Sequence, residues 1–556
     1  MSAGALSGQL RQLGDCAEIR GGSAEAADLR RLASIVEAGG DPEAARLRAL
    51  AAKGRLSELG DLSPALQRRL EELLATDPAP VLESARAGLP WLLRRLLHDQ
   101  ILDTPRAAAL ARVGIVTLGD LQAALQEARL PPDAPAASLE AFATAPAAAD
   151  RPRMPLGRAE DVLEHLILLL GTSCPNLAGL APAGDVRRFE PLVDSLCLAG
   201  WAADPPAVLD RIAGLPQLQP VLHRTGRRAL VTYQQAEVDI RVAAPDEFGT
   251  VLYAATGSAA HLASMRARQR RTRICAREED VYREAGLPWI PPELRQGTGE
   301  VEAAARGRLP ALVERRHIRG DLHMHTSYSD GRDSIVEMVQ VAESLGYEYI
   351  AITDHSERSW ASRTVTRETL ARQRDEIARV RERFPGIAIL HGIEVDIMPD
   401  GRLDFPDALL EPLDIVLASL HDPAGHDRAR LTERCLAAIR HPLVNVITHP
   451  ANQMVGRDTG HDLDFPAIYE AAARTGTALE IDGAPGHLDM DGPHARDAIA
   501  AGATVTIDSD CHRARLLDKQ MRLGVGTARR GWVEPRHVLN ARPLAEVRAF
   551  IAAKRA

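Results

Sequence analysis

The chain has few aromatic residues, no paired cysteine motif and no long apolar run. Phe, Trp and Tyr make up 3% of its 556 residues, so an aliphatic core is expected. The six cysteines form no C-x-x-C pair, which argues against a disulfide framework or a zinc ribbon and fits reduced thiols. No apolar run reaches about 18 residues and the N-terminus shows no apolar signal core, so we expect a cytoplasmic protein that does not contact a membrane.

An excess of positive charge is also lacking. The net charge of −9 gives no support to a protein that coats nucleic acid, although it leaves room for a local basic groove. One basic cluster is present, formed by Arg266, Arg268, Arg270, Arg271 and Arg273. Two interpretations of this cluster remain open, a solvated face and a contact to phosphates.

The length predicts several domains, because one core rarely grows to this size. Residues 1–150 are predicted to be helical, from apolar spacings of three to four residues in Ala24–Ala38, Pro42–Lys53, Ser63–Leu74 and Pro105–Val113. The stretch Leu130–Pro155 is rich in Ala, Pro and Asp and is predicted to be a linker. Residues 151–315 mix helix and strand, with paired strands at Ala229–Tyr233 and Glu237–Val242 and a helical stretch over 259–315.

Residues 316–556 alternate between short apolar stretches and amphipathic ones. The predicted helices are Ser334–Leu345, Arg367–Phe384, Ala429–Arg440 and Phe465–Thr475. The predicted strands are Asp321–Met324, Tyr349–Thr353, Ala388–Glu394, Asp414–Ser419, Val444–Thr448, Thr477–Ile481 and Thr504–Ile507. Seven such repeats predict a distorted parallel (β/α)7 barrel, in which chemistry gathers at the C-terminal ends of the strands.

Six of the seven predicted strands end in residues that bind divalent metals. Fourteen of the 18 histidines follow residue 315, and six of these lie at or just after a predicted strand. A single histidine in such a place is usually a buried core residue, but six at successive strand ends are not explained in that way. The candidate metal ligands are His323, His325, Asp330, His355, Glu394, His421, His449, Asp510 and His512. Nine ligands exceed the needs of one ion, so we expect two to three divalent ions of zinc, manganese or iron.

Clustered divalent ions of this kind favour hydrolysis of phosphate esters. We expect the catalytic residues to be His323, His325, Glu394, Asp510 and His512, with Glu394 bridging two ions. Asp354 precedes His355 and is predicted to orient a ligating imidazole from outside the ligand set. Cys511 lies between two ligands and should point to the opposite face, and His487 is left out of the predicted set.

These motifs resemble the PHP domain, the family named for polymerase and histidinol phosphatase. His-Met-His, Thr-Asp-His, Gly-Ile-Glu, Ser-Leu-His, Thr-His-Pro and Asp-Cys-His occur in that order over residues 316–556. The resemblance implies a distorted seven-stranded barrel with a trinuclear metal site, and the nine candidate ligands match its positions one by one. Asp330 stands at a place that is histidine in some members of the family.

The resemblance extends upstream to bacterial family X DNA polymerases. Thr256-Gly257-Ser258, and the stretch from Gly286 to Arg295 that reads Gly-Leu-Pro-Trp-Ile-Pro-Pro-Glu-Leu-Arg, are similar to that family. It implies helix-hairpin-helix DNA-binding motifs in 1–150, an α+β nucleotidyltransferase palm and thumb in 151–315, and a PHP barrel in 316–556. In that family the PHP domain implies a 3′–5′ exonuclease, sometimes with phosphatase or abasic-site activity.

The chain departs from this family at the palm. The resemblance implies an Asp-x-Asp pair for two magnesium ions, but Ser195 and Cys197 stand at those places. Asp194 is one residue early and on a strand would face the other way, whereas Asp239 keeps the third carboxylate. One carboxylate cannot hold two magnesium ions, so polymerase activity is doubtful unless Asp194 and Asp239 rescue it or the palm is aligned one residue out.

The chain also departs at the two DNA-binding hairpins. Asp61-Leu62-Ser63 and Ile101-Leu102-Asp103 replace Gly-x-Gly turns in which backbone amides approach a phosphate. We therefore expect weak binding to DNA 3′ ends or gapped DNA. The leading hypothesis is a metal-dependent phosphoesterase on a polymerase-like body, acting on DNA ends or phosphate monoesters. The alternatives are an active repair polymerase with an exonuclease, and a DNA-binding or regulatory module without catalysis.

Overall fold

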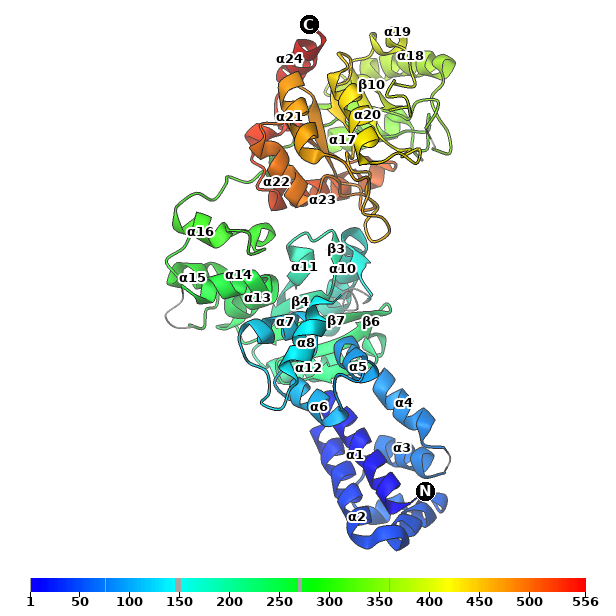
Figure 1. Ribbon diagram of the computed structural model, residues 1–556, viewed down its shortest axis with the longest axis vertical. Helices are drawn as coiled ribbons and strands as arrows, with labels where there is room; N and C mark the ends of the chain where they lie inside the picture. Colours follow the sequence, from blue (N-terminus) through cyan, green and yellow to red (C-terminus); the bar gives the residue numbers. More distant parts are fainter. Residues whose placement is uncertain (1, 76, 146–151, 269–272, 360) are drawn as a thin grey trace. The chain divides into compact units, whose positions relative to one another are not determined.

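The computed structural model describes all residues except 1, 76, 146–151, 269–272 and 360 (Figure 1). Within the described residues, no helix is both long enough and apolar enough to cross a membrane. The chain forms two compact units, which are described one at a time. The first unit comprises Met1–Pro152, Val162–Gly184 and Asp194–Trp289, and the second comprises Arg153–Asp161, Asp185–Val193 and Ile290–Ala556.

The first unit begins with helices that share one apolar core. Leu6, Leu10 and Leu13 recur on one face of α1 and are buried in this core. Gly40 has φ of 61° and interrupts the helical dihedrals of α2, so the two predicted helices on either side of it are confirmed. The helices are α1 (Ala3–Ile19), α2 (Ser23–Ala52), α3 (Pro64–Ala75), α4 (Ala79–Ala87), α5 (Trp91–His98), α6 (Thr104–Arg112), α7 (Leu118–Gln126) and α8 (Ala136–Thr144).

Helix α8 corrects the linker predicted over Leu130–Pro155. Its residues Leu139 and Phe142 are three apart on one helical face, and both are buried in the N-terminal core. The burial of these two apolar side chains stabilises a helix that the Ala- and Pro-rich composition did not predict. Residues 146–151 of the predicted linker lie outside the described part of the chain.

A five-stranded sheet follows in the first unit, with strand order β2-β4-β7-β6-β5. Strands β6 and β7 pair antiparallel, which confirms the predicted pairing, and β4 runs parallel to β7. The strands are β2 (Ala178–Ala183), β4 (Leu196–Trp201), β5 (Val221–Arg224), β6 (Arg228–Tyr233) and β7 (Ala236–Ala243). The helices along this part of the chain are α10 (Leu156–Ser173), α11 (Gly184–Arg187), α12 (Pro205–Ala213), α13 (Phe248–Thr256), α14 (Ala259–Arg266) and α15 (Glu278–Glu284), and the residues of α10 and α11 are divided between the two units.

The stretch 259–315 is less helical than predicted. Beyond α14 and α15, its described residues form the short helix α16 (Glu300–Ala305) and single 3-10 turns. Prolines at 288, 291, 292 and 310 explain the difference, because proline removes an amide donor and disfavours helix at the residue before it.

The second unit is built on a parallel sheet with strand order β14-β13-β12-β11-β10-β9-β8, as the sequence predicted. A parallel bridge between Met324 and Cys511, just beyond the two edge strands, nearly closes the sheet into a barrel. The strands are β8 (Gly320–Asp321), β9 (Tyr349–Ile352), β10 (Ala388–Asp396), β11 (Ile415–Ser419), β12 (Val446–Ile447), β13 (Ala478–Asp482) and β14 (Val505–Asp508). A two-residue pair, β1 (Met154–Pro155) and β3 (Leu192–Val193), also belongs to this unit.

The four helices predicted between these strands are confirmed to within one residue at each end, as α17 (Ile335–Ser344), α18 (Arg367–Arg383), α20 (Arg428–Arg440) and α21 (Phe465–Thr475). Two more helices lie between strands, α19 (Asp407–Leu410) and α22 (Gly492–Ala500), and two follow the last strand, α23 (Leu517–Arg530) and α24 (Leu544–Arg555). Alternate strand residues enter two different cores. Ile350 and Ile352 of β9 join the large core that includes helix residues, whereas Tyr349 and Ala351 join a smaller core with residues of the other strands.

Candidate metal centre and palm residues

Glu394 stands at the centre of the histidine cluster. On β10 it lies on the same face as Leu390, which packs in the smaller core. This face of the strand is therefore apolar at Leu390 and polar at Glu394. Its Oε2 lies 2.7 Å from His355 Nδ1 and 3.4 Å from His323 Nε2. Its Oε1 lies 3.1 Å from His449 Nε2 and 3.6 Å from His421 Nε2. One buried carboxylate thus faces imidazoles from four segments of the chain on both of its oxygens.

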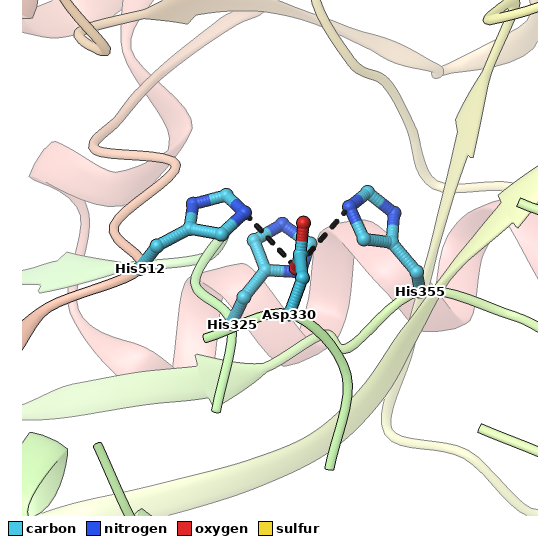
Figure 2. Close-up of side chains that lie close together, drawn as sticks. All are labelled: His325, Asp330, His355 and His512. Atoms are coloured by element: carbon cyan, nitrogen blue, oxygen red, sulfur yellow. Dashed lines mark ion pairs between the residues drawn. The ribbon is translucent and has the colours of Figure 1, made fainter. Parts of the chain in front are cut away.

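The remaining predicted ligands surround Asp330 and Asp510. Figure 2 shows the imidazoles of His355 and His512 on either side of Asp330, at 3.7 and 3.1 Å from its Oδ1. His325 Nε2 lies 3.0 Å from Asp510 Oδ1. One possible ligand atom from each of His325, Asp330, His355 and His512 lies within 4.8 Å of the others. The structure therefore brings all nine predicted ligands together, while their coordination of metal remains a prediction.

Three of the imidazoles are held through their outer nitrogen. The Nδ1 atoms face Glu480 for His323 (2.7 Å), Asp396 for His421 (2.8 Å) and the carbonyl of Asp510 for His512 (2.9 Å). A neutral imidazole that donates from Nδ1 carries its lone pair on Nε2, and each of these Nε2 atoms faces a cluster carboxylate. This arrangement is typical of metal-bound histidine, so the residues present fit divalent ions.

The electrostatics of the cluster's own residues favour ionised carboxylates but do not leave every imidazole neutral. Against the effect of burial, Glu480 raises the pKa of His323 well above its usual range, and Asp396 and Asp510 raise the pKa values of His421 and His512 to about 9, so metal binding would displace protons from these three.

Burial alone would raise the pKa of Glu394, but His355 and His323 hold it well below its usual range. Burial likewise opposes ionisation of Asp510, yet His323 and His512 keep its pKa low. Burial lowers the pKa of His325 to about 3. The carboxylates are therefore ionised and this imidazole is neutral at pH 7.

Asp354 has a different role from the one predicted. Its oxygens accept hydrogen bonds from the backbone amides and hydroxyls of Thr326 and Ser329 and from the amide of Gln373. It therefore fixes the turn that leads to Asp330 and does not orient an imidazole. Cys511 lies in the large hydrophobic core, away from the ligand set, as its predicted orientation required.

Sequence reasoning missed three residues that belong to this cluster. Glu480 and Asp482 are two apart on β13, on the face that Ala478 shares with the smaller core, and His487 follows in the next loop. The signal was Leu-Glu-Ile-Asp, an alternation of apolar and acidic residues at the end of the sixth strand. It was overlooked because histidine marks five of the other six strand ends.

In the palm, Cys197 and Asp239 are register partners on β4 and β7. Asp239 is buried, and its carboxylate accepts hydrogen bonds from Arg228 at 2.7 and 2.9 Å and from Arg241 at 3.0 Å. Arg228 also donates to Asp120 at 2.9 Å. Burial raises the pKa of the Cys197 thiol to about 12, so it is neutral. The guanidinium groups of Arg228 and Arg241 are thus hydrogen-bonded to Asp239, the carboxylate that the resemblance assigns to binding magnesium.

Asp194 and Ser195 lie before β4, which begins at Leu196, and both are exposed. Asp194 is therefore not on the strand that carries Cys197. A rescue of the metal site by Asp194 would have required it to lie on β4, and the chain enters β4 only after both residues.

Both hairpin positions now serve as helix caps. Ser63 Oγ accepts a hydrogen bond from the amide of Leu66 at 3.2 Å, and Asp103 accepts one from the amide of Arg106 at 3.0 Å. These side chains satisfy amides at helix N-termini, where a glycine turn would leave backbone amides open to a phosphate.

The described arginines of the basic cluster include two that already form ion pairs. Arg266 pairs with Glu127, and Arg273 with Glu284 at 3.2 Å. Arg270 and Arg271 lie outside the described residues.

Comparison with known proteins finds relatives of the PHP domain alone and a relative of most of the chain. The model of the PHP domain family matches residues 321–454. The DNA polymerase/3′-5′ exonuclease PolX of Bacillus subtilis (strain 168) is 34% identical over 423 residues, which cover 72% of this chain and 73% of that protein. A probable phosphatase of Shewanella oneidensis is 33% identical over 35% of this chain and 76% of its own length. The probable phosphatase YcdX of Escherichia coli O81 (strain ED1a) is 31% identical over 35% of this chain and 78% of its own length.

The PHP match and the gathered histidines and carboxylates make this chain an enzyme of the metal-dependent phosphoesterase class. The similarity to PolX extends over more than two thirds of both proteins and so includes much more than the PHP domain. The chain therefore belongs to the bacterial family X DNA polymerases that carry a C-terminal PHP domain.

Proposed function

We propose that the second unit hydrolyses phosphate esters at a centre of two to three divalent ions, and that the palm no longer polymerises DNA. The observation that carries the first part is the position of Glu394, which faces His323 and His355 on one oxygen and His421 and His449 on the other. A carboxylate with imidazoles on both oxygens is suited to bridge two ions. Zinc, manganese or iron suits this nitrogen and oxygen ligand set.

Bound ions would supply an activated water and charge to hold the phosphate oxygens. The chain's own residues prepare that chemistry. Glu480 holds His323 through Nδ1 and also accepts the backbone amide of His449 at 2.7 Å, so one carboxylate positions two predicted ligands. Asp354 does the same for the turn that presents Asp330. His512 and Asp330, which are only partly buried, form the side of the cluster that a phosphate can reach.

For the substrate, we propose the 3′ end of DNA first and phosphate monoesters second. Support for DNA comes from the relative whose name records a 3′-5′ exonuclease, and support for monoesters from the probable phosphatases. The test is metal analysis of the purified protein, followed by assays with manganese on single-stranded DNA, gapped DNA, abasic DNA, RNA and small monoesters. Less than about one tightly bound ion per chain after reloading would contradict the metal centre.

The proposed loss of polymerase activity is supported by the charge balance around Asp239. Asp120 and Asp239 face Arg228 and Arg241, so two negative charges meet two positive ones within the protein. Two magnesium ions would have to displace both guanidinium groups and would find a neutral thiol where the second carboxylate is needed. The alternative of an active repair polymerase requires this displacement of Arg228 and Arg241.

The other alternative, a module without catalysis, is disfavoured by the intact ligand set. Nine converging ligands with oriented imidazoles serve no purpose in a surface that only binds DNA. Hydrolysis assays on the panel above, together with primer extension, separate the three hypotheses.

A further inference from the structure

A second group of metal-binding side chains lies beside the predicted ligand set. Asp482 ends β13, His487 lies in the loop that follows, and Asp510 comes just after β14. One possible ligand atom from each lies within 4.8 Å of the others. Neither Asp482 nor His487 is among the nine predicted ligands, whereas Asp510 is shared with the group formed by His323 and His325.

Two buried atoms of this group lack hydrogen-bond partners among the described residues. Asp482 is fully buried, and its Oδ1 accepts the amide of Ala484 at 2.6 Å while its Oδ2 has no partner. The Nδ1 of His487 is also buried without a partner, and the ring stacks on that of His449 with centroids 5.2 Å apart. Buried polar atoms without partners are costly and rare, so these two atoms indicate a missing ligand.

The charges around the group point to a cation. Asp482 and Asp510 are both buried, and Glu480 of the same strand face is buried as well. Carboxylates this close repel one another unless a proton or a cation lies between them. The imidazole of His487 beside them offers a nitrogen ligand, which a shared proton would not need.

We propose that Asp482 and His487 bind a further divalent cation and share Asp510 with the main centre. The inference rests on the proposed function, because it assumes that Asp510 is a metal ligand there. Two carboxylates and one imidazole suit manganese, zinc or iron. Three protein ligands leave open coordination positions, so an ion here would have room for water or for an oxygen of the phosphate ester.

The first test counts ions in the full-length protein. Wild type, His487→Gln and Asp482→Asn are stripped of metal, reloaded with excess Mn²⁺, desalted and analysed by elemental mass spectrometry. His441→Gln is the matched control, because His441 pairs with Asp407 on the surface, away from the cluster. We expect each cluster variant to hold about one ion per chain fewer than wild type, and the control to hold the same number. Equal counts in wild type and in folded variants would overturn the proposal.

The second test needs no variant and applies even if the substitutions impair folding. Crystals of the wild-type protein grown with Mn²⁺ are measured at the manganese absorption edge. We expect an anomalous peak between Asp482 and Asp510, separate from those near Glu394. Peaks near Glu394 with none at Asp482 would reject this site and leave the proposed function intact, whereas no peaks in either place would reject both.

Discussion

The sulfur of Cys197 lies 4.0 Å from Oδ2 of Asp239 across the parallel strands β4 and β7. In a palm that binds two magnesium ions, carboxylates are expected on both strands. Here one strand offers a neutral thiol, and the other offers a carboxylate already bound by Arg228 and Arg241. In this palm, the guanidinium groups of Arg228 and Arg241 supply the positive charge beside Asp239.

The first prediction is that the chain does not extend a primer. The assay uses a gapped template and Glu394→Ala protein, so that hydrolysis cannot remove the product. We expect no extension, and none after Cys197→Asp, because Arg228 and Arg241 still occupy Asp239. Extension by Glu394→Ala that disappears on adding Asp239→Ala would prove the palm active.

The second prediction concerns the stability that this charge network provides. Arg228→Ala should lower the free energy of unfolding by about 3 kcal/mol, because it leaves the buried Asp239 and the partly buried Asp120 short of a partner. Arg227→Ala is the control, since its side chain is 54% exposed and pairs with Glu247 on the surface. The control should cost at most about 1 kcal/mol. Denaturant unfolding followed by circular dichroism measures both, and equal losses would show that the network is not stabilising.

The fold of the second unit could be predicted because each strand has a recognisable pattern in the sequence. Apolar strands with a polar residue at the end recur between amphipathic helices, and all seven predicted strands occur in the sheet. The ligand set could be predicted for the same reason, since a parallel barrel brings its strand ends to one side. Asp482 was missed because an acidic residue after a strand is common, and only the structure shows that its Oδ2 is buried without a partner.

The role of Asp354 could not be derived from its place beside His355. Neighbours on a strand point to opposite faces, so the partners of Asp354 depend on which loop packs there. That loop, with Thr326 and Ser329, comes from another strand end. The helix α8 was hidden for a related reason, because two apolar residues decide its packing and composition alone does not reveal them.

The third prediction is that Glu394→Ala abolishes hydrolysis without unfolding the protein. Loss of a residue that merely orients a ligand costs about 10–100-fold, so loss of a bridging ligand should cost at least about a hundredfold in turnover. Glu433→Gln, which removes a surface carboxylate paired with Arg430, should leave turnover unchanged. Hydrolysis near the wild-type rate by Glu394→Ala, with folding confirmed by circular dichroism, would contradict the proposed centre.

The fourth prediction separates orientation from coordination. Glu480→Gln keeps an oxygen that can accept from His323, but its amide nitrogen cannot accept the backbone amide of His449. We expect metal affinity to fall by about 10–100-fold while saturating metal restores most of the turnover. Competition with a chelator measures the affinity. If turnover stays low at saturating metal, Glu480 acts in the reaction itself and not only by positioning.

The last prediction is that the chain binds gapped DNA weakly. Ser63 and Asp103 cap helices where a glycine turn would offer amides to a phosphate, and Arg266 and Arg273 are engaged with Glu127 and Glu284. We expect a Kd of about 10⁻⁴–10⁻⁶ M near physiological salt, as for non-specific binding, and a steep loss of affinity as salt rises. Fluorescence anisotropy with the full-length Glu394→Ala protein measures this without degrading the DNA.

Asp103→Asn keeps the cap and removes a negative charge, so it should tighten binding slightly without a loss of stability. Asp103→Ala removes charge and cap together, and should cost about 1 kcal/mol of stability. Nanomolar binding of gapped DNA by the unmodified N-terminal sequence would mean that these helices hold DNA by contacts other than the hairpin amides.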